Sequence, residues 1–401
     1  MTDPVLQRPD AFCPCLRFCV CSDLHIKEAD DEHVNRLRQL MRTAYQIAEA
    51  DALYPKLDAF LFAGDLTDHG KPAQFRAFWD TVQSERQPGT QVLACIPRYH
   101  DNWEFGKGGK KTGLGHFRAI TGLSTDTHLQ IGPFHFIAVS TSEKDCYYDR
   151  KQKRWLKQAL KDAAKDNPDA PVFFMQHEHA RNTVYGSSAF DGWGLTHFSR
   201  IFRKYPNLVH FSGHSHYPLN DPRSVWQGAF TAVGTGALSY AELTVDGSRQ
   251  VHPDGYKDVA QGWLVEADAS GQLRMRGYDF LSGQLLCERF RGAELYPVPT
   301  EAPRFLPGAQ LRVTRCAERI RVTFPRAASL PGDPVCAYRV CLSRGAEPVA
   351  EATVVPPYWQ SDPPARHTID LPPAAGAVVV SVAAENAYGV QSEPIRLRAD
   401  D

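Results

Sequence analysis

The stretch DAFLFAGDLTD, residues 58–68, joins a short apolar run to two carboxylates. Residues 58–64 are mostly aromatic, aliphatic or small, a composition that favours a buried β-strand. Gly64 lets the backbone turn sharply where this strand ends. Asp65 and Asp68 are therefore predicted to lie just beyond the carboxyl end of a strand.

The same arrangement recurs along the first half of the chain. Apolar runs predict further strands at 16–22, 91–97, 134–140, 171–177 and 207–214. Apolar residues spaced at i, i+3 and i+4 predict helices between them, at 31–50, 71–84, 150–165 and 195–204. Strands that alternate with helices indicate an α/β domain whose sheets are covered by helices.

Beyond residue 216 the pattern changes to short strands and turns that continue the same domain. A proline-rich stretch, YPVPTEAPRFLPG, cannot continue regular structure and is predicted to be a linker. The remainder alternates polar and apolar residues between Pro and Gly turns, which indicates a small all-β sandwich. We expect a first domain at 1–295, a linker at 296–308 and the sandwich at 309–401.

Composition limits the class of protein. The 401-residue chain has 45 Lys and Arg against 46 Asp and Glu, a formal net charge of −1, which argues against a dedicated nucleic-acid binder. No apolar run approaches the roughly 18 residues of a membrane span, and the N-terminus lacks the features of a secretory signal. We expect a cytoplasmic protein with its ten cysteines as thiols; an exported form that has lost its signal is the alternative.

Four cysteines crowd into CPCLRFCVC, residues 13–21. The spacing is C-x-C, not the C-x2-C that is typical of zinc sites. We therefore favour a buried strand, with Cys19 and Cys21 as core residues, over a zinc knuckle.

Residues that can bind metal follow five of the predicted strands. They are Asp23, His25, Asp65, Asp68, Tyr99, His100, Asp101, His177, His214 and His216. In open α/β sheets ligands bind outside the carboxyl ends of the strands, so these motifs are expected to converge. Carboxylates mixed with imidazoles suit manganese, iron or zinc better than calcium. Two such ions about 3.5–4 Å apart would clamp an in-line displacement at phosphorus, with Asp65 as the candidate shared ligand.

The series D-x-H, G-D-x-x-D, R-Y-H-D, H and G-H-S-H closely resembles the calcineurin-like metallophosphoesterase superfamily over about residues 16–290. The resemblance implies a four-layer α/β/β/α sandwich. It implies a metal-dependent phosphoesterase that hydrolyses a phosphodiester, or less favourably a phosphomonoester, by a hydroxide that bridges two metal ions.

The resemblance also implies roles for individual residues. The first metal would be bound by Asp23, His25 and His216, and the second by His177 and His214, with Asp65 bridging the two. His100 would contact the phosphate or protonate the leaving group, with Asp23 as its partner.

Three residues depart from the superfamily pattern. Tyr99 stands where an asparagine binds the second metal, so Tyr99 binds that metal itself, a water fills the gap, or the site is weak. Arg98 replaces a glycine, and is either a solvated loop residue or a substrate-binding contact to the phosphate. His179 competes with His177; we favour His177, which directly follows its strand, and expect His179 in the pocket or on the surface.

The tail resembles a fibronectin type III domain. The matching residues are Tyr338, Val382, Ala384, Asn386, Gly389 and Ser392. This resemblance implies a seven-stranded sandwich that serves as a spacer or docks a protein partner.

Three hypotheses follow. The first is a phosphoesterase with two divalent or trivalent ions (Mn, Fe or Zn). It would act on a small phosphorylated substrate and would not associate with a membrane. The second is a metal-poor pseudoenzyme, in which the phosphoesterase fold and the sandwich form a binding scaffold. The third, a nuclease, is disfavoured by the neutral charge.

Overall fold

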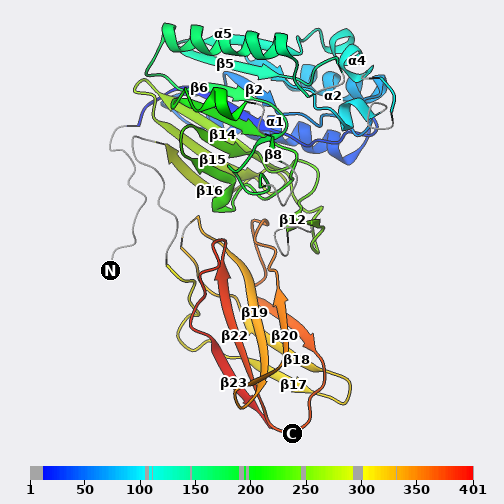
Figure 1. Ribbon diagram of the computed structural model, residues 1–401, viewed down its shortest axis with the longest axis vertical. Helices are drawn as coiled ribbons and strands as arrows, with labels where there is room; N and C mark the ends of the chain where they lie inside the picture. The colour runs from blue at the N-terminus through cyan, green and yellow to red at the C-terminus, as the bar shows by residue number, and fades with distance from the viewer. Residues whose placement is uncertain are drawn as a thin grey trace. The chain divides into compact units, whose positions relative to one another are not determined.

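The computed structural model describes residues 12–103, 108–110, 112–144, 147–188, 194–195, 198–244, 250–291, 301–330 and 332–400. The chain divides into two compact units (Figure 1). The second unit comprises 297–401 with the short segments 220–222 and 253–255, and the first unit comprises the rest. The boundary lies among residues 292–300, outside the described residues, so the predicted linker and domain limits stay predictions.

The first unit contains two six-stranded sheets. One has the order β16-β15-β14-β1-β2-β3, in which β1, β2 and β3 are parallel and β14–β16 form an antiparallel meander beside β1. Its strands are β1 (Pro14–Cys21), β2 (Ala59–Phe62), β3 (Gln91–Ala94), β14 (Gln261–Asp268), β15 (Leu273–Asp279) and β16 (Gln284–Arg291).

The second sheet has the order β10-β11-β9-β6-β5-β4, and its four central strands are parallel. Its strands are β4 (Asp126–Ile131), β5 (Phe134–Val139), β6 (Val172–Met175), β9 (Leu208–Ser212), β10 (Val225–Gln227) and β11 (Thr231–Gly234). Shorter elements are β7 (His179–Ala180), β8 (Gly194–Leu195), β12 (Leu243–Thr244), β13 (Gln250–Val251), η1 (His100–Asn102) and η2 (Pro222–Ser224).

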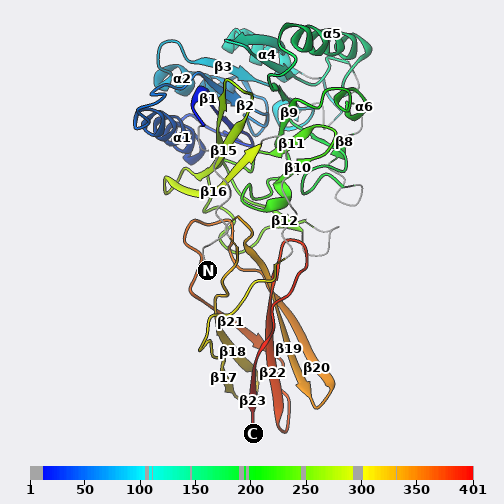
Figure 2. The ribbon, with the colours of Figure 1, turned by 90° about the vertical axis from the view of Figure 1, so that its left-hand side faces the viewer.

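Helices cover the outer faces of both sheets. The helices α1 (Glu32–Glu49), α2 (Pro72–Glu85) and α4 (Thr112–Thr121) pack on the first sheet, and α5 (Arg150–Asp166) and α6 (Ser199–Phe202) pack on the second. Figure 2 shows the two helical layers on opposite sides of the sheets. The sheets face each other through a core that includes Phe18, Phe136, Phe173 and Trp263. The predicted four-layer α/β/β/α sandwich is confirmed.

The sequence analysis did not predict α4 or β4. Two glycines near the start of α4 weaken its helical signal. Strand β4 is a polar edge strand whose pairing with β5 is a tertiary contact. The prediction for the cysteines is confirmed, because Cys19 and Cys21 are buried thiols in β1. None of the described helices is long and apolar enough to cross a bilayer.

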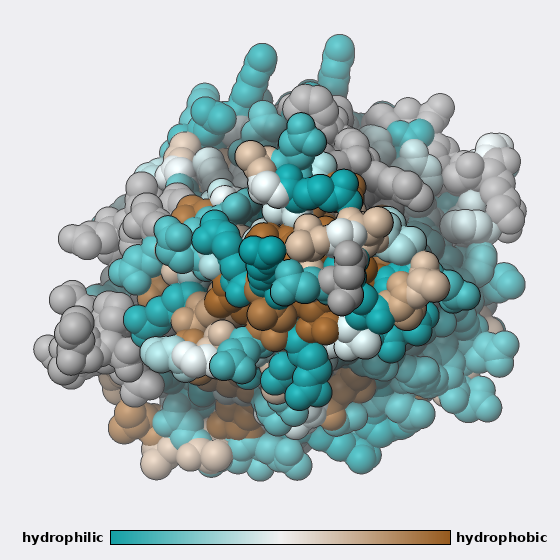
Figure 3. Space-filling model, turned by 90° about the horizontal axis from the view of Figure 1, so that it is seen from below, coloured by the Kyte–Doolittle hydropathy of each residue, from teal (hydrophilic) through white to brown (hydrophobic). Residues whose placement is uncertain are grey.

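The second unit is a β-sandwich of seven strands, as predicted. One sheet contains β17 (Arg312–Arg315), β18 (Ile320–Pro325) and β21 (Arg366–Leu371), and the other contains β19 (Val335–Arg344), β20 (Glu347–Val354), β22 (Val378–Asn386) and β23 (Ile395–Ala399). Its core includes Phe324, Tyr338 and Val380. Figure 3 shows apolar side chains among hydrophilic ones on the face viewed from below. The resemblance to fibronectin type III stays a prediction.

Candidate metal centre

Backbone strain is concentrated at the predicted ligand motifs. Six described residues other than glycine have positive φ angles: Asp23 (55°), His25 (50°), Asp65 (50°), Asn182 (58°), His214 (75°) and His216 (56°). Five of these six are predicted metal ligands. A side chain in this region costs of order 1–3 kcal/mol and persists only where the surroundings hold it. The fold therefore holds these residues in an unfavourable backbone conformation that sets the direction of their side chains.

The loops after β1 and β2 are held together by backbone hydrogen bonds. The N–H of Asp23 donates to the carbonyl of Gly64 (3.0 Å), and the N–H of His25 donates to that of Asp65 (3.0 Å). Gly64 has a φ of 90°, and a Cβ there would lie 2.6 Å from Nδ1 of His177. A Cβ on Gly213 would lie 2.4 Å from a carboxylate oxygen of Asp23. These two glycines allow the motifs to approach closely.

The first group of potential ligands contains Asp23, His25, Asp65 and His216, all buried, with one ligand atom of each within 4.8 Å of the others. Nε2 of His216 lies 3.1 Å from Oδ1 of Asp23 and 3.1 Å from Nε2 of His25. Nε2 of His25 lies 3.7 Å from Oδ2 of Asp65. Four nitrogen and oxygen atoms thus lie close enough together to hold one metal ion.

The second group contains Asp65, His177 and His214. Nε2 of His177 lies 3.1 Å from Oδ2 of Asp65, and the rings of His177 and His214 are 4.9 Å apart. Asp65 belongs to both groups. It is therefore placed to bridge two ions.

Hydrogen bonds outside the centre orient its histidines. Nδ1 of His177 donates to the carbonyl of Ala63 (2.8 Å), and Nδ1 of His216 donates to that of Tyr240 (3.0 Å). Each bond leaves Nε2 facing the carboxylates, an arrangement that is common around bound metals. In the described part of the chain, buried Oδ1 of Asp65 has no hydrogen-bond partner. Such an atom is rarely left unsatisfied, and a metal ion would satisfy it.

Electrostatics at the centre favour ionised carboxylates. Burial raises the pKa of Asp23, but the neighbouring His216 and His177 outweigh it and bring the pKa to about 2. Burial lowers the pKa of His25 to about 4, so this imidazole is neutral at pH 7. Burial also opposes the charge of His177, but Asp65 raises its pKa to about 10. Metal binding would have to displace that proton.

His100 has a different partner from the one expected. Its Nδ1 lies 3.1 Å from the carbonyl oxygen of Asp68, and its ring lies 4.5 Å from that of His25. Asp23 is engaged elsewhere, because both of its oxygens accept the N–H of His214 (3.1 Å each) and one pairs with His216. Asp68 also lies 3.7 Å from Nδ1 of His25. It therefore connects His100 to the first group.

Asp101 has a structural role that the sequence analysis did not assign. It is fully buried and accepts hydrogen bonds from the N–H of Leu66 (3.1 Å) and from the N–H (2.8 Å) and hydroxyl (2.6 Å) of Thr67. These bonds attach the loop that carries His100 to the loop that carries Asp65. The only signal in the sequence was the adjacency of His100 and Asp101.

Tyr99 lies with Tyr147 and Arg98. It is 41% exposed, and its ring centroid is 6.5 Å from that of Tyr147. Burial and a hydrogen bond that the Tyr147 hydroxyl donates to Tyr99 raise the pKa of Tyr147. The guanidinium of Arg98 lies over the Tyr147 ring at 4.8 Å and over the Tyr99 ring at 5.6 Å. These contacts engage the Tyr99 ring and its hydroxyl, and its role as a ligand stays a prediction.

His179 is a core residue, contrary to the expectation of a pocket or surface position. It is 1% exposed, and its two ring nitrogens bond the hydroxyls of Ser212 (2.7 Å) and Ser215 (2.8 Å). Neither nitrogen is available to a metal. The geometry therefore favours His177 as the ligand.

Solved structures of other proteins resemble part of this chain. The solved structures similar to this chain include a purple acid phosphatase, PPD1, from yellow lupin (Lupinus luteus) seeds, with 16% identity and a TM-score of 0.49 over 69% of this chain and 53% of the lupin chain. They also include GAP50, the anchor in the inner membrane complex of Plasmodium, with 13% identity and a TM-score of 0.44 over 68% of this chain and 87% of that one. The present chain thus spans about half of the lupin protein.

No curated protein matches the chain. The family model for calcineurin-like phosphoesterases matches residues 16–218, about half of the chain, and this segment contains every residue of both ligand groups. The chain therefore belongs to the calcineurin-like phosphoesterase family.

Proposed function

We propose that this protein hydrolyses phosphoric esters with two divalent or trivalent metal ions, which we expect to be manganese, iron or zinc. The observation that supports this proposal is the sharing of Asp65 between two groups of buried ligand atoms. Mixed imidazole and carboxylate ligands suit these three metals. Bound there, the ions would supply an activated water and neutralise charge on the phosphoryl oxygens.

The surrounding residues have distinct tasks in this proposal. His100 is 32% exposed beside the first group, so it is accessible to a substrate and can donate a proton to the leaving oxygen. Asp68 would hold the orientation of His100 through Nδ1. Arg98 would contact a phosphoryl oxygen after leaving the Tyr147 ring. We propose a diester as substrate, because a diester monoanion needs fewer cationic contacts than a monoester dianion.

The position of Tyr99 predicts that the two metal sites differ in affinity. The first group offers four ligands, and the second offers three. We expect elemental analysis of manganese-saturated, desalted protein to find about one ion per chain, and about two in Tyr99→Asn, since the shorter amide is free to leave Tyr147. About two ions in the wild type would show instead that the second site is complete without an asparagine.

An activity assay distinguishes the enzyme hypothesis from the pseudoenzyme hypothesis. Excess manganese in the assay should give hydrolysis of bis(p-nitrophenyl) phosphate with a higher kcat/KM than p-nitrophenyl phosphate. His100→Ala should lower the rate about 10²–10⁴-fold without loss of metal. A wild-type protein that turns over neither ester with manganese, iron or zinc would support the pseudoenzyme hypothesis.

We further propose a reducing compartment such as the cytoplasm and a protein partner for the sandwich. The nine described cysteines are all free, among them Cys13 and Cys15, which are exposed. Exposed apolar side chains of the sandwich offer contact area: Leu306, Val349, Val355, Tyr388 and Leu397.

A further inference from the structure

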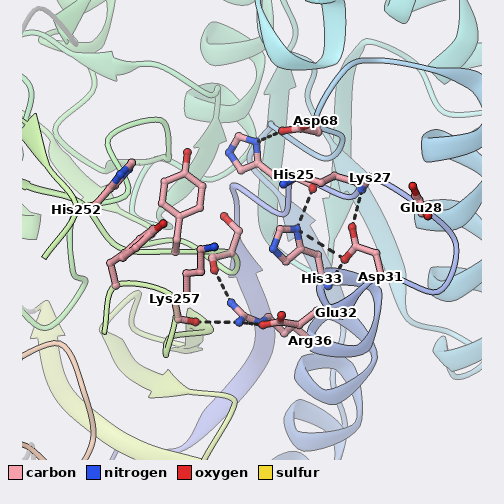
Figure 4. Close-up of a pocket in the computed structure, with 13 residues that line it drawn as sticks. His25, Lys27, Glu28, Asp31, Glu32, His33, Arg36, Asp68, His252 and Lys257 are labelled. Atoms are coloured by element: carbon pink, nitrogen blue, oxygen red, sulfur yellow. Dashed lines mark hydrogen bonds and ion pairs between the residues drawn. The ribbon is translucent and has the colours of Figure 1, made fainter. Parts of the chain in front are cut away.

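A cavity of about 490 Å³ opens beside the first metal group. His25 and Asp68 line the cavity next to this group, and the residues around the start of α1 form one wall. In Figure 4, His252 faces these α1 residues from the opposite side. The volume is that of a small-molecule site. Because it begins at the metal ligands, it is placed to receive a group attached to a bound phosphate.

The wall opposite α1 is aromatic. The ring of Tyr240 lies 4.2 Å from that of His216 and 5.6 Å from that of His25. Next to it, His252 and Tyr256 stack at 4.6 Å with an interplanar angle of 13°, and Tyr240 meets the His252 ring edge-on at 5.4 Å. The aromatic surface thus runs without a break from the metal ligands to the mouth of the cavity.

The guanidinium of Arg36, the buried cation of the cavity, is already hydrogen-bonded to other parts of the protein. The guanidinium of Arg36 donates to the carbonyls of Val259 (2.9 Å), Leu238 (3.2 Å) and Lys257 (2.8 Å) and pairs with Glu32. Arg36 therefore ties the aromatic wall to α1 and does not serve as a free anion site.

A carboxylate and a hydroxyl complete the lining. Asp31 caps α1 and accepts the N–H of Lys27 (2.8 Å), so it is also occupied. By contrast, the hydroxyl of Ser239, a residue that is 1% exposed, has no hydrogen-bond partner in the described part of the chain. It is a polar atom left available to a ligand.

We propose that this cavity holds the organic group of the ester and selects a planar aromatic ring there, through stacking on Tyr240 and on the His252–Tyr256 pair. The inference rests on the proposed function, since it needs a phosphoryl group at the metal centre. Paired aromatic rings stabilise each other by more than the burial of their surface area explains. An aliphatic ring of equal size lacks this extra attraction. Ser239 would donate to or accept from a substituent on the ring.

The test compares ligands that differ only in the ring. Phenylphosphonate and cyclohexylphosphonate carry the same anionic group, and neither has an ester bond to hydrolyse. In calorimetric titrations of the manganese-loaded protein, we expect the phenyl compound to bind about tenfold more tightly. A second pair, adenosine 5′-phosphate and ribose 5-phosphate, distinguishes a general preference for flat rings from one limited to single aryl rings. Phosphorus NMR checks that these two esters stay intact.

Variants test whether the aromatic wall of the cavity causes the preference for the phenyl ring. Tyr256→Leu should lower the phenyl-to-cyclohexyl ratio towards one, because it removes half of the stacked pair while Tyr240 remains, and Tyr256→Phe should retain the wild-type ratio. Tyr205→Leu, a half-buried tyrosine packed on the other helical layer, is the matched control and should keep the wild-type ratio. Manganese content should be equal in all of them, because none of these side chains binds metal.

A ratio near one in the wild type, or a ratio that survives in Tyr256→Leu, would overturn the inference. Hydrolysis of p-nitrophenyl esters could still be normal in that case, and the proposed function would stand. Ring-selective binding without turnover of any ester would instead support the inference about the cavity and contradict the proposed enzymatic function. Absence of binding by either phosphonate would count against both.

Discussion

Asp65→Asn is expected to abolish binding of both metal ions and to lower kcat/KM about 10³-fold, which corresponds to about 4 kcal/mol of transition-state stabilisation. Asp65 is the single residue that belongs to both ligand groups. Asparagine keeps the volume but removes the negative charge that attracts both ions. A variant confined to the second group, His177→Ala, should keep the ion of the first group, so its manganese content after desalting should equal that of the wild type.

The measurement combines elemental analysis, kinetics and thermal unfolding. Manganese at 100 times its dissociation constant should stabilise the wild type by about 2.7 kcal/mol and leave Asp65→Asn unchanged. Asp126→Asn is the matched control, since this half-buried carboxylate bonds Gln152 outside the metal centre. Retention of the wild-type manganese content by Asp65→Asn would show that the centre is not built around a shared carboxylate.

Arg17→Ala is expected to lower the free energy of unfolding of the first unit by about 3–5 kcal/mol, the usual result of breaking a buried ion pair. The side chain of Arg17 is fully buried in β1. Its Nε donates to Glu266 on β14 (2.7 Å), and its guanidinium also pairs with Asp51 and bonds the carbonyl of Ala48 (3.3 Å) at the end of α1. The variant removes this donor from buried Glu266 and from the carbonyl of Ala48.

Denaturant unfolding followed by tryptophan fluorescence measures this loss, because six of the seven tryptophans belong to the first unit. Arg42→Gln provides the control. Arg42 is exposed and pairs with Glu85 on the surface, where ion pairs contribute little. We expect no measurable change for it. An Arg17→Ala protein as stable as the wild type would mean that Arg274 and Arg276, which also bond Glu266, satisfy that carboxylate by themselves.

The amino-acid pattern alone was enough to predict the layers and most of the candidate ligands. Strand and helix periods identified the buried strands that bear the motifs, and each motif lies at the carboxyl end of its strand, where ligands converge. Asp23 and His25 were recognised because their motif is one of five that follow predicted strands in order. Periodicity could not find β4 or α4, whose polar and glycine-containing sequences are stabilised by neighbours.

Which polar side chains are occupied, and by which partners, became clear from the three-dimensional arrangement of the chain. His177 and His179 follow the same strand, yet Ser212 and Ser215 satisfy His179 from another segment of the chain. The carbonyl of Asp68 bonds His100 while Asp23 bonds His214 and His216, and Asp101 fastens two loops that lie more than 30 residues apart. Local spacing cannot reveal such assignments, because the hydrogen bonds of a buried polar atom are set by whichever distant residues the fold brings to it.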